Sequence, residues 1–166
     1  MTTIASILAT IRGINYLNDV DGNRWTDTEL LAPLNLAIEA VRRVRPDANV
    51  LSTAFQLAPG VRQTAPSGTS RVLDVACNLG ADGLVVGDAI LPVDRPTMDK
   101  AAPWWTSATG TAVEHWMPDL SPVTFYVYPA CDGYYVRLQR EALLDVVTGA
   151  STFPLRDEFI EPVQAY

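Results

Sequence analysis

The chain has 166 residues, 48% of them apolar, so it is long enough to bury the core of one domain of ordinary size. Its net charge of −7 disfavours direct binding to nucleic acid, which requires a basic face. No run reaches the roughly 18 apolar residues that a membrane span requires, and the segment after Met1 lacks a basic n-region, so we expect neither a membrane helix nor a signal peptide.

The first expected helix covers residues 3–12, where Ile4, Ile7, Leu8 and Ile11 recur at helical spacing. Residues 18–23 then form a polar stretch rich in Asn, Asp and Gly. This stretch partly matches a calcium-binding loop, but its glycine stands at the fifth place and not the sixth. We interpret it as a turn, because these three residue types dominate turns for reasons unrelated to metals.

The second expected helix, over about residues 27–45, has the best-marked start in the chain. Thr26 stands three residues before Glu29, which is the spacing of a capping box, and Trp25 and Leu30 occupy the positions of a hydrophobic staple. An apolar stripe follows at intervals of three or four residues, and Pro46 ends the helix. We expect Pro33 to bend it, because proline removes one backbone hydrogen bond.

A β-rich region is expected over about residues 49–140. Residues 49–57 are typical of a strand, 61–68 of a loop, and 71–79 of either a buried strand or a short helix. Residues 83–93 suggest a hairpin that turns at Gly87-Asp88, and residues 97–102 a short helix. Residues 124–138 predict a second hairpin, with its turn at residues 131–133.

A last helix is expected over residues 154–166, with Thr152 as its cap and Pro154 in its first turn. Together these elements predict a single α+β domain over residues 1–166. We expect it to be a small helical bundle, built on the long helix at 27–45, with an antiparallel β region inserted at about 49–140.

Catalytic and metal-binding motifs are nearly absent from the sequence. It contains no P-loop, no G-x-S-x-G, no H-E-x-x-H and no G-x-G-x-x-G, so we predict no catalytic residue, no metal and no cofactor. Cys77 and Cys131 stand far apart and form no C-x-x-C pair, which favours free thiols in a cytoplasmic setting. A thiol nucleophile with His115 as its base is the enzymatic alternative.

Three of the four tryptophans lie close together in the sequence, at Trp104, Trp105 and Trp116. They could form a platform for stacking sugars, which would make the protein a carbohydrate-binding module. Core packing or a subunit interface is the preferred interpretation, because aromatic residues are enriched in both. We take these three residues, with Phe159 and Tyr166, as candidate interface residues.

A set of motifs resembles tailed-bacteriophage adaptor proteins, which are head–tail connector subunits of the virion neck. The motifs stand in the same order over about residues 20–160 and comprise Arg24–Leu31, Leu34-Asn35, Arg45–Ala48, Phe55–Gly60, Gln63, Pro66–Gly68, Arg71–Val75, Pro103–Trp105, Pro122–Pro129 and Leu155–Phe159. Each motif alone is only a cap or a strand, whereas their shared order makes the resemblance specific.

The resemblance implies a structural virion protein and not an enzyme. Copies would form a ring of twelve beneath the portal, extend the DNA channel and dock the tail or a tail-completion protein. DNA would pass through the lumen without sequence-specific binding, and assembly would take place in the host cytoplasm. Relatives look like a helical bundle with an inserted β region, and closed rings require two different faces of each subunit to meet.

Overall fold

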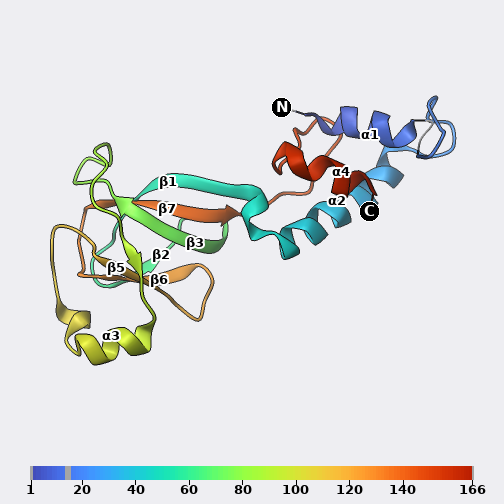
Figure 1. The fold of residues 1–166 in the computed structure, drawn as a ribbon. Helices are drawn as coiled ribbons and strands as arrows, with labels where there is room; N and C mark the ends of the chain where they lie inside the picture. Colours follow the sequence, from blue (N-terminus) through green and yellow to red (C-terminus); the bar gives the residue numbers. More distant parts are fainter. Residues whose placement is uncertain (1, 14–15, 166) are drawn as a thin grey trace. The chain divides into compact units, whose positions relative to one another are not determined.

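The computed structural model describes residues 2–13 and 16–165, which form two compact units. Unit 1 contains residues 1–49 and 144–166, and unit 2 contains residues 50–143. Unit 2 is therefore an insertion in unit 1 along the chain (Figure 1). No helix among the described residues combines the length and the hydropathy needed to cross a membrane.

Unit 1 is built from helices α1 (Ile4–Arg12), α2 (Asp27–Val44) and α4 (Ile160–Ala165), with the 3-10 turns η1 (Pro46–Asn49) and η3 (Asp157–Phe159). The N-terminal segment contacts residues 151–153, which precede η3. Phe153 donates its N–H to the Thr2 carbonyl, and Ile4 donates its N–H to the Ser151 carbonyl. Its core residues are Ile4, Ile7, Leu8, Leu30, Leu34, Ala37, Ile38, Ala48, Val147, Phe153, Leu155, Phe159 and Val163.

The prediction of a small helical bundle with a long helix is wrong. The described residues contain four short helices and two sheets, in an α+β fold. The reason lies in what covers the apolar stripe of α2. Val147, Phe153 and Leu155 come from an irregular segment, and α1 and α4 have only nine and six residues, so no second long helix packs along α2.

Unit 2 contains two sheets. The first has the strand order β1–β7–β3, from β1 (Val50–Gln56), β7 (Tyr135–Ala142) and β3 (Thr69–Asn78), and both pairings are antiparallel. The second has the order β2–β6–β5–β4, from β2 (Arg62–Thr64), β6 (Thr124–Tyr128), β5 (His115–Pro118) and β4 (Leu91–Pro92). In this second sheet β4 runs parallel to β5, and the other pairs are antiparallel.

One core of unit 2 joins residues of the two sheets. Alternate residues of β6 and β7 are buried, as the period of two in a strand requires, and they include Phe125, Val127, Val136 and Leu138. The rings of Phe55 and Phe125 pack 6.0 Å apart, from β1 of one sheet and β6 of the other. A second cluster contains Met98 of α3 (Arg95–Ala101), Ala102, Trp105 and Met117.

Two local predictions for unit 2 are wrong. Residues 124–138 do not form a hairpin, because β6 pairs with β2 and β5 while β7 pairs with β1 and β3. Pro129 has no N–H to extend a ladder, and Ala130 instead exchanges backbone hydrogen bonds with Ala108 and Gly110. Residues 84–86 are not a strand either, but an exposed loop between β3 and β4.

Candidate assembly surface

The tryptophans singled out in the sequence lie in different environments. Trp105 is 2% exposed, packs edge-to-face on Tyr126 at 5.6 Å, and donates its indole N–H to Asp99 at 2.7 Å. Trp116 is 7% exposed and belongs to the core that joins the two sheets. Trp104 is 63% exposed. Stacking sugars would need exposed ring faces, so this arrangement does not support a platform of three tryptophans.

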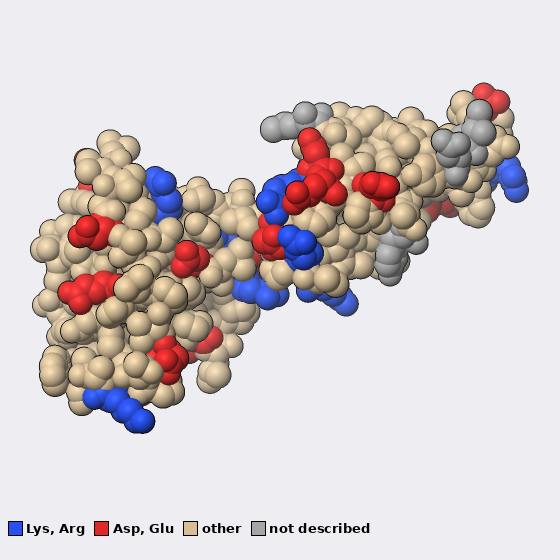
Figure 2. All heavy atoms as spheres, in the orientation of Figure 1, with Lys and Arg blue, Asp and Glu red and all other residues tan. Residues whose placement is uncertain are grey.

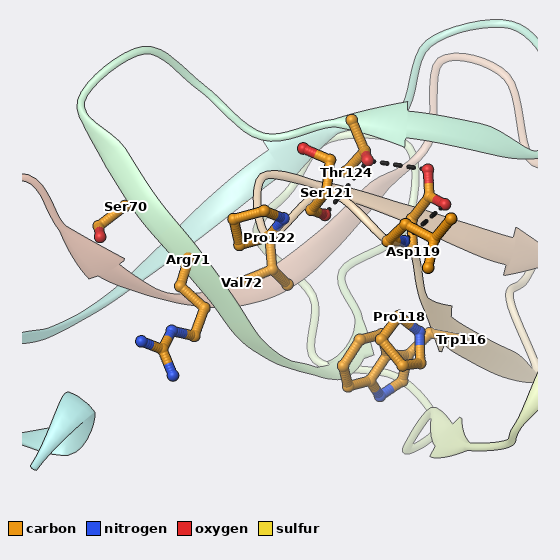
Figure 3. A pocket seen from close by; sticks show the side chains of 10 residues that line it. Ser70, Arg71, Val72, Trp116, Pro118, Asp119, Ser121, Pro122 and Thr124 are labelled. Atoms are coloured by element: carbon orange, nitrogen blue, oxygen red, sulfur yellow. Dashed lines mark hydrogen bonds between the residues drawn. The ribbon is translucent and has the colours of Figure 1, made fainter. Parts of the chain in front are cut away.

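Trp116 also lines a pocket of unit 2 with a volume of about 450 Å³ (Figure 3). The pocket lies between the first residues of β3 and the loop from β5 to β6. Its apolar lining comprises Val72, Trp116, Pro118, Leu120 and Pro122, and Ser70, Arg71, Asp119, Ser121 and Thr124 complete it. Sequence reasoning missed this pocket, because its two halves are about 45 residues apart in the chain.

The rim of the pocket is held in place by Asp119. Its carboxylate accepts hydrogen bonds from the Thr124 hydroxyl at 2.9 Å and from Arg62 at 3.0 Å, as well as from the N–H of Leu120. These hydrogen bonds lower the pKa of Asp119 below its ordinary value, and the bond from Thr124 has the largest effect. The loop from β5 to β6 is therefore a fixed wall, even though Leu120 at its tip is fully exposed.

Cys131 does not have the environment of a nucleophilic thiol. Cys131 is buried and donates to the Pro129 carbonyl, and its burial raises the pKa of the thiol to about 11. A nucleophilic cysteine requires the opposite shift, because the thiolate is the reactive form. His115 stacks on Tyr128 with ring centroids 6.2 Å apart. The part of the chain that the structure describes holds no cluster of three or more His, Cys, Asp or Glu suited to a metal ion.

The polar stretch before α2 is organised by a buried carboxylate. Asp19 is 5% exposed and accepts hydrogen bonds from the backbone N–H groups of Asn23, Arg24 and Trp25. Burial alone would raise the pKa of Asp19, but these three N–H groups and the charge of Arg12 lower it below its ordinary value. Residues 18–25 thus form a turn in which the side chain of Asp19 accepts hydrogen bonds from three backbone N–H groups.

The start of α2 has both bonds of a capping box. The Thr26 hydroxyl accepts from the Glu29 N–H at 3.3 Å, and Glu29 Oε2 accepts from the Thr26 N–H at 2.8 Å. Hydrogen bonding from Thr26 lowers the pKa of Glu29. Leu30 is buried, whereas Trp25 is 43% exposed. Thr26 and Glu29 therefore cap the start of α2, and Leu30 packs in the core of unit 1.

The remaining candidate interface residues are Phe159 and Tyr166. Phe159 is 7% exposed and lies in the core of unit 1, where the guanidinium groups of Arg45 and Arg156 face its ring at 5.5 and 5.8 Å. Both arginines also bind Asp47, at 2.8 and 3.1 Å. Tyr166 lies outside the described residues. Phe159 is therefore a packing residue of the unit 1 core.

On the face drawn in Figure 2, acidic and basic side chains alternate over a mostly uncharged surface. Several acidic and basic side chains of the described residues form ion pairs, as in Arg12–Asp27 at 2.8 Å and Arg62–Asp119 at 2.9 Å. A nucleic-acid interface would instead gather Lys and Arg into one stripe. The arrangement agrees with the net charge of −7 in disfavouring direct nucleic-acid binding through this face.

A family model described as "SU10 adaptor protein" matches residues 2–166, which is nearly the whole chain. No curated protein matches the chain. The family match confirms the resemblance to phage adaptor proteins that the ordered motifs predict.

Proposed function

The chain belongs to the SU10 adaptor protein family, and we propose from this that it is a structural subunit of a phage virion that joins head and tail. The observation that carries the proposal is the extent of the match, because residues 2–166 include both units and not one shared module. A structural role is also consistent with the raised pKa of Cys131 and with the burial of two of the three clustered tryptophans.

We further propose that twelve copies form a closed ring beneath the portal protein, in the virion neck between capsid and tail. The ring would extend the DNA channel on one side and dock the tail, or a tail-completion protein, on the other. Assembly would take place in the host cytoplasm. Its partners would then be further copies of itself, the portal and a tail component, with no membrane and no cofactor.

DNA would pass through the lumen of this ring without sequence-specific contacts. The net charge of −7 supports that part of the proposal, because an acidic wall repels the phosphate backbone. A channel lined mainly by Arg and Lys in an assembled ring would contradict it.

The test is assembly with the portal protein of the same phage. The purified chain is mixed with portal, and the complex is weighed by mass photometry and imaged by electron microscopy. The expected result is a ring on one end of the portal with twelve times the mass of one subunit. A chain that stays monomeric and never associates with portal or tail proteins would refute the proposal.

A further inference from the structure

An exposed apolar loop stands at one end of unit 2. Leu84, Val85 and Val86 are 81, 65 and 60% exposed and follow one another in the chain. Single exposed apolar residues are common on protein surfaces, but three in succession are a candidate contact site. Gly83 and Gly87 flank them, so the triplet is confined to the tip of the loop.

The base of this loop is anchored to the sheet. Gly87 donates its N–H to the Asn78 carbonyl at 2.9 Å, and Asn78 donates its own N–H to the Asp88 carbonyl at 3.0 Å. Gly83 has a φ of +74° and lies against the Tyr135 ring, where a Cβ would come within 3.1 Å of the ring carbons. The apolar tip is therefore held in place at both ends, which lowers the entropic cost of placing it in a binding site.

The pocket described above offers space and chemistry for such a tip. An apolar cavity of about 150 Å³ holds a benzene-sized group, so a pocket of about 450 Å³ has room for more than one branched side chain. Val72, Trp116, Pro118 and Pro122 give it an apolar lining (Figure 3). Leu120, which is fully exposed, completes that lining. Insertion would remove apolar surface from water on both sides of the contact.

The loop and the pocket lie at opposite ends of one strand. The pocket includes Ser70, Arg71 and Val72 at the start of β3, and the loop follows Asn78 at its end. Asn78 lies six positions after Val72 in the strand, which is about 20 Å at roughly 3.3 Å per residue. In Figure 1 the loop after β3 and the loop from β5 to β6 extend from opposite ends of the sheets. Two complementary patches on opposite ends of one unit suit head-to-tail association.

The exposed charges at the two ends have opposite signs. Asp82 and Asp88, beside the loop, are exposed. At the pocket the side chains of Arg71 and Arg62 are 48 and 59% exposed, while those of their partners Glu141 and Asp119 are only 2 and 9% exposed. Exposed carboxylates thus flank the loop, whereas the exposed groups beside the pocket are guanidinium groups that are already paired with Glu141 and Asp119. A carboxylate of one copy can therefore share a paired guanidinium group of the next copy without placing two like charges together.

We propose that the Leu84–Val86 loop of one copy inserts into the pocket lined by Val72, Trp116 and Pro122 of the next copy. This head-to-tail contact then links successive subunits around the ring. The occupant of the pocket is therefore a second copy of this chain. The inference rests on the proposed function, because it supplies the contact between the subunits of the proposed ring.

The first test is Leu84→Glu. Because Leu84 is 81% exposed, the fold should survive, and unchanged near-ultraviolet circular dichroism would show it. Self-association should weaken about 30-fold, the size expected for a hot-spot residue. The matched control is Leu36→Glu, since Leu36 is 64% exposed on α2 of unit 1 and should leave association unchanged.

The second test is cross-linking between copies. In a Cys77→Ser background, a chain with Leu84→Cys and Leu120→Cys should form a ladder of covalent oligomers on oxidation, and each single variant should stop at the dimer or below. The control pair is Leu84→Cys with Leu36→Cys. Rings that assemble normally with Leu84→Glu, and that give no ladder with the first pair, would overturn the loop-and-pocket contact while the adaptor function stands. If the wild-type chain forms no ring even with portal, the proposed function fails and this contact fails with it.

Discussion

Gln63 offers the sharpest test of how unit 2 is held together. Its side chain is fully buried and makes three hydrogen bonds to the turn between β1 and β2. Oε1 accepts from the Ala58 N–H at 2.8 Å, and Nε2 donates to the carbonyls of Ala58 at 2.9 Å and Gly60 at 2.7 Å. The substitution Gln63→Glu keeps the shape of the side chain and replaces both N–H donors with an oxygen.

The cost of Gln63→Glu follows from these three bonds. An ionised carboxylate would face two carbonyl oxygens in a buried site, so the folded-state pKa of the new carboxyl is raised and the group folds protonated. Taking up that proton at pH 7 costs about 3.7 kcal/mol, from an unfolded-state pKa near 4.3. The protonated carboxyl can donate only one hydrogen bond, and the carbonyl left unpaired costs about 1–3 kcal/mol. The expected destabilisation at pH 7 is about 5 kcal/mol.

The dependence on pH has a definite sign. Because the folded-state pKa is raised, the variant keeps its stability below the unfolded-state pKa and loses it as pH rises, by about 1.4 kcal/mol per pH unit. At pH 5 the difference from the wild-type chain should shrink to about 2–4 kcal/mol.

The assay is urea unfolding followed by tryptophan fluorescence at pH 5, 6 and 7. Trp105 and Trp116 are buried in unit 2, so the signal reports on the unit that contains Gln63. The control is Gln56→Glu, which makes the same charge change at an exposed residue of β1. The reasoning would be refuted if Gln63→Glu lowered the free energy of unfolding by less than about 1 kcal/mol at pH 7. It would also be refuted if the difference from the wild-type chain did not vary with pH.

Three further predictions concern the cap, the acid stability and the thiol. Thr26→Ala should destabilise unit 1 by about 1 kcal/mol in urea unfolding followed by circular dichroism, while Thr28→Ala in the same turn should not; equal losses would contradict the capping role. The bonds from Arg45 lower the pKa of Asp47 to about 2, so its stabilising contribution is present above the ordinary value near 3.8 and disappears as pH falls toward 2. The Asp47→Asn variant should therefore lose less free energy of unfolding than the wild-type chain when the pH is lowered from about 3.8 to 2. An acid titration that is the same for both chains would contradict this prediction. Burial holds the pKa of Cys131 at about 11, so in a Cys77→Ser background a thiol reagent at pH 8 should label it only after urea is added; rapid labelling of the folded chain would disprove this.

Two helix starts are predicted well from the sequence, whereas the last is not: α4 begins at Ile160 and not at Pro154, and Thr152 forms an isolated β-bridge with Thr3 where a cap was expected. The structure has α2 beginning at Asp27, directly after Thr26, and α1 beginning after Thr3, whose side chain accepts from the Ser6 N–H. Both starts depend on residues three apart in the chain, so the information is local. The packing around α2 depends on residues more than 100 positions away, such as Val147, and local patterns could not reveal that a loop covers it.

The pairing of strands is where sequence reasoning fails in this chain. Residues 124–128 and 135–142 are both strands, but each joins a different sheet, because pairing is decided by competition among all strands. Neighbouring tryptophans show the same limit for the site. Trp104 is 63% exposed and Trp105 only 2%, a difference that depends on Asp99 and Tyr126 and on no feature of the two residues themselves. The apolar triplet at Leu84–Val86 was visible in the sequence, but the same pattern also indicates a buried strand.

Because unit 2 is inserted within unit 1 along the chain, the proposed contact between copies and the acid-sensitive ion pairs of Asp47 lie in different units. Antiparallel pairing of β1 with β7 sets Val50 opposite Glu141, so both ends of unit 2 lie at the same end of its first sheet. Unit 1 can then complete its core from two distant segments, with Asp47 binding Arg45 and Arg156 across them. The proposed contact between copies lies wholly in unit 2, whereas the acid-sensitive pairing of Asp47 lies in unit 1. A ring that dissociates with Leu84→Glu should therefore retain the acid stability of unit 1, because the two perturbations act on different sets of residues.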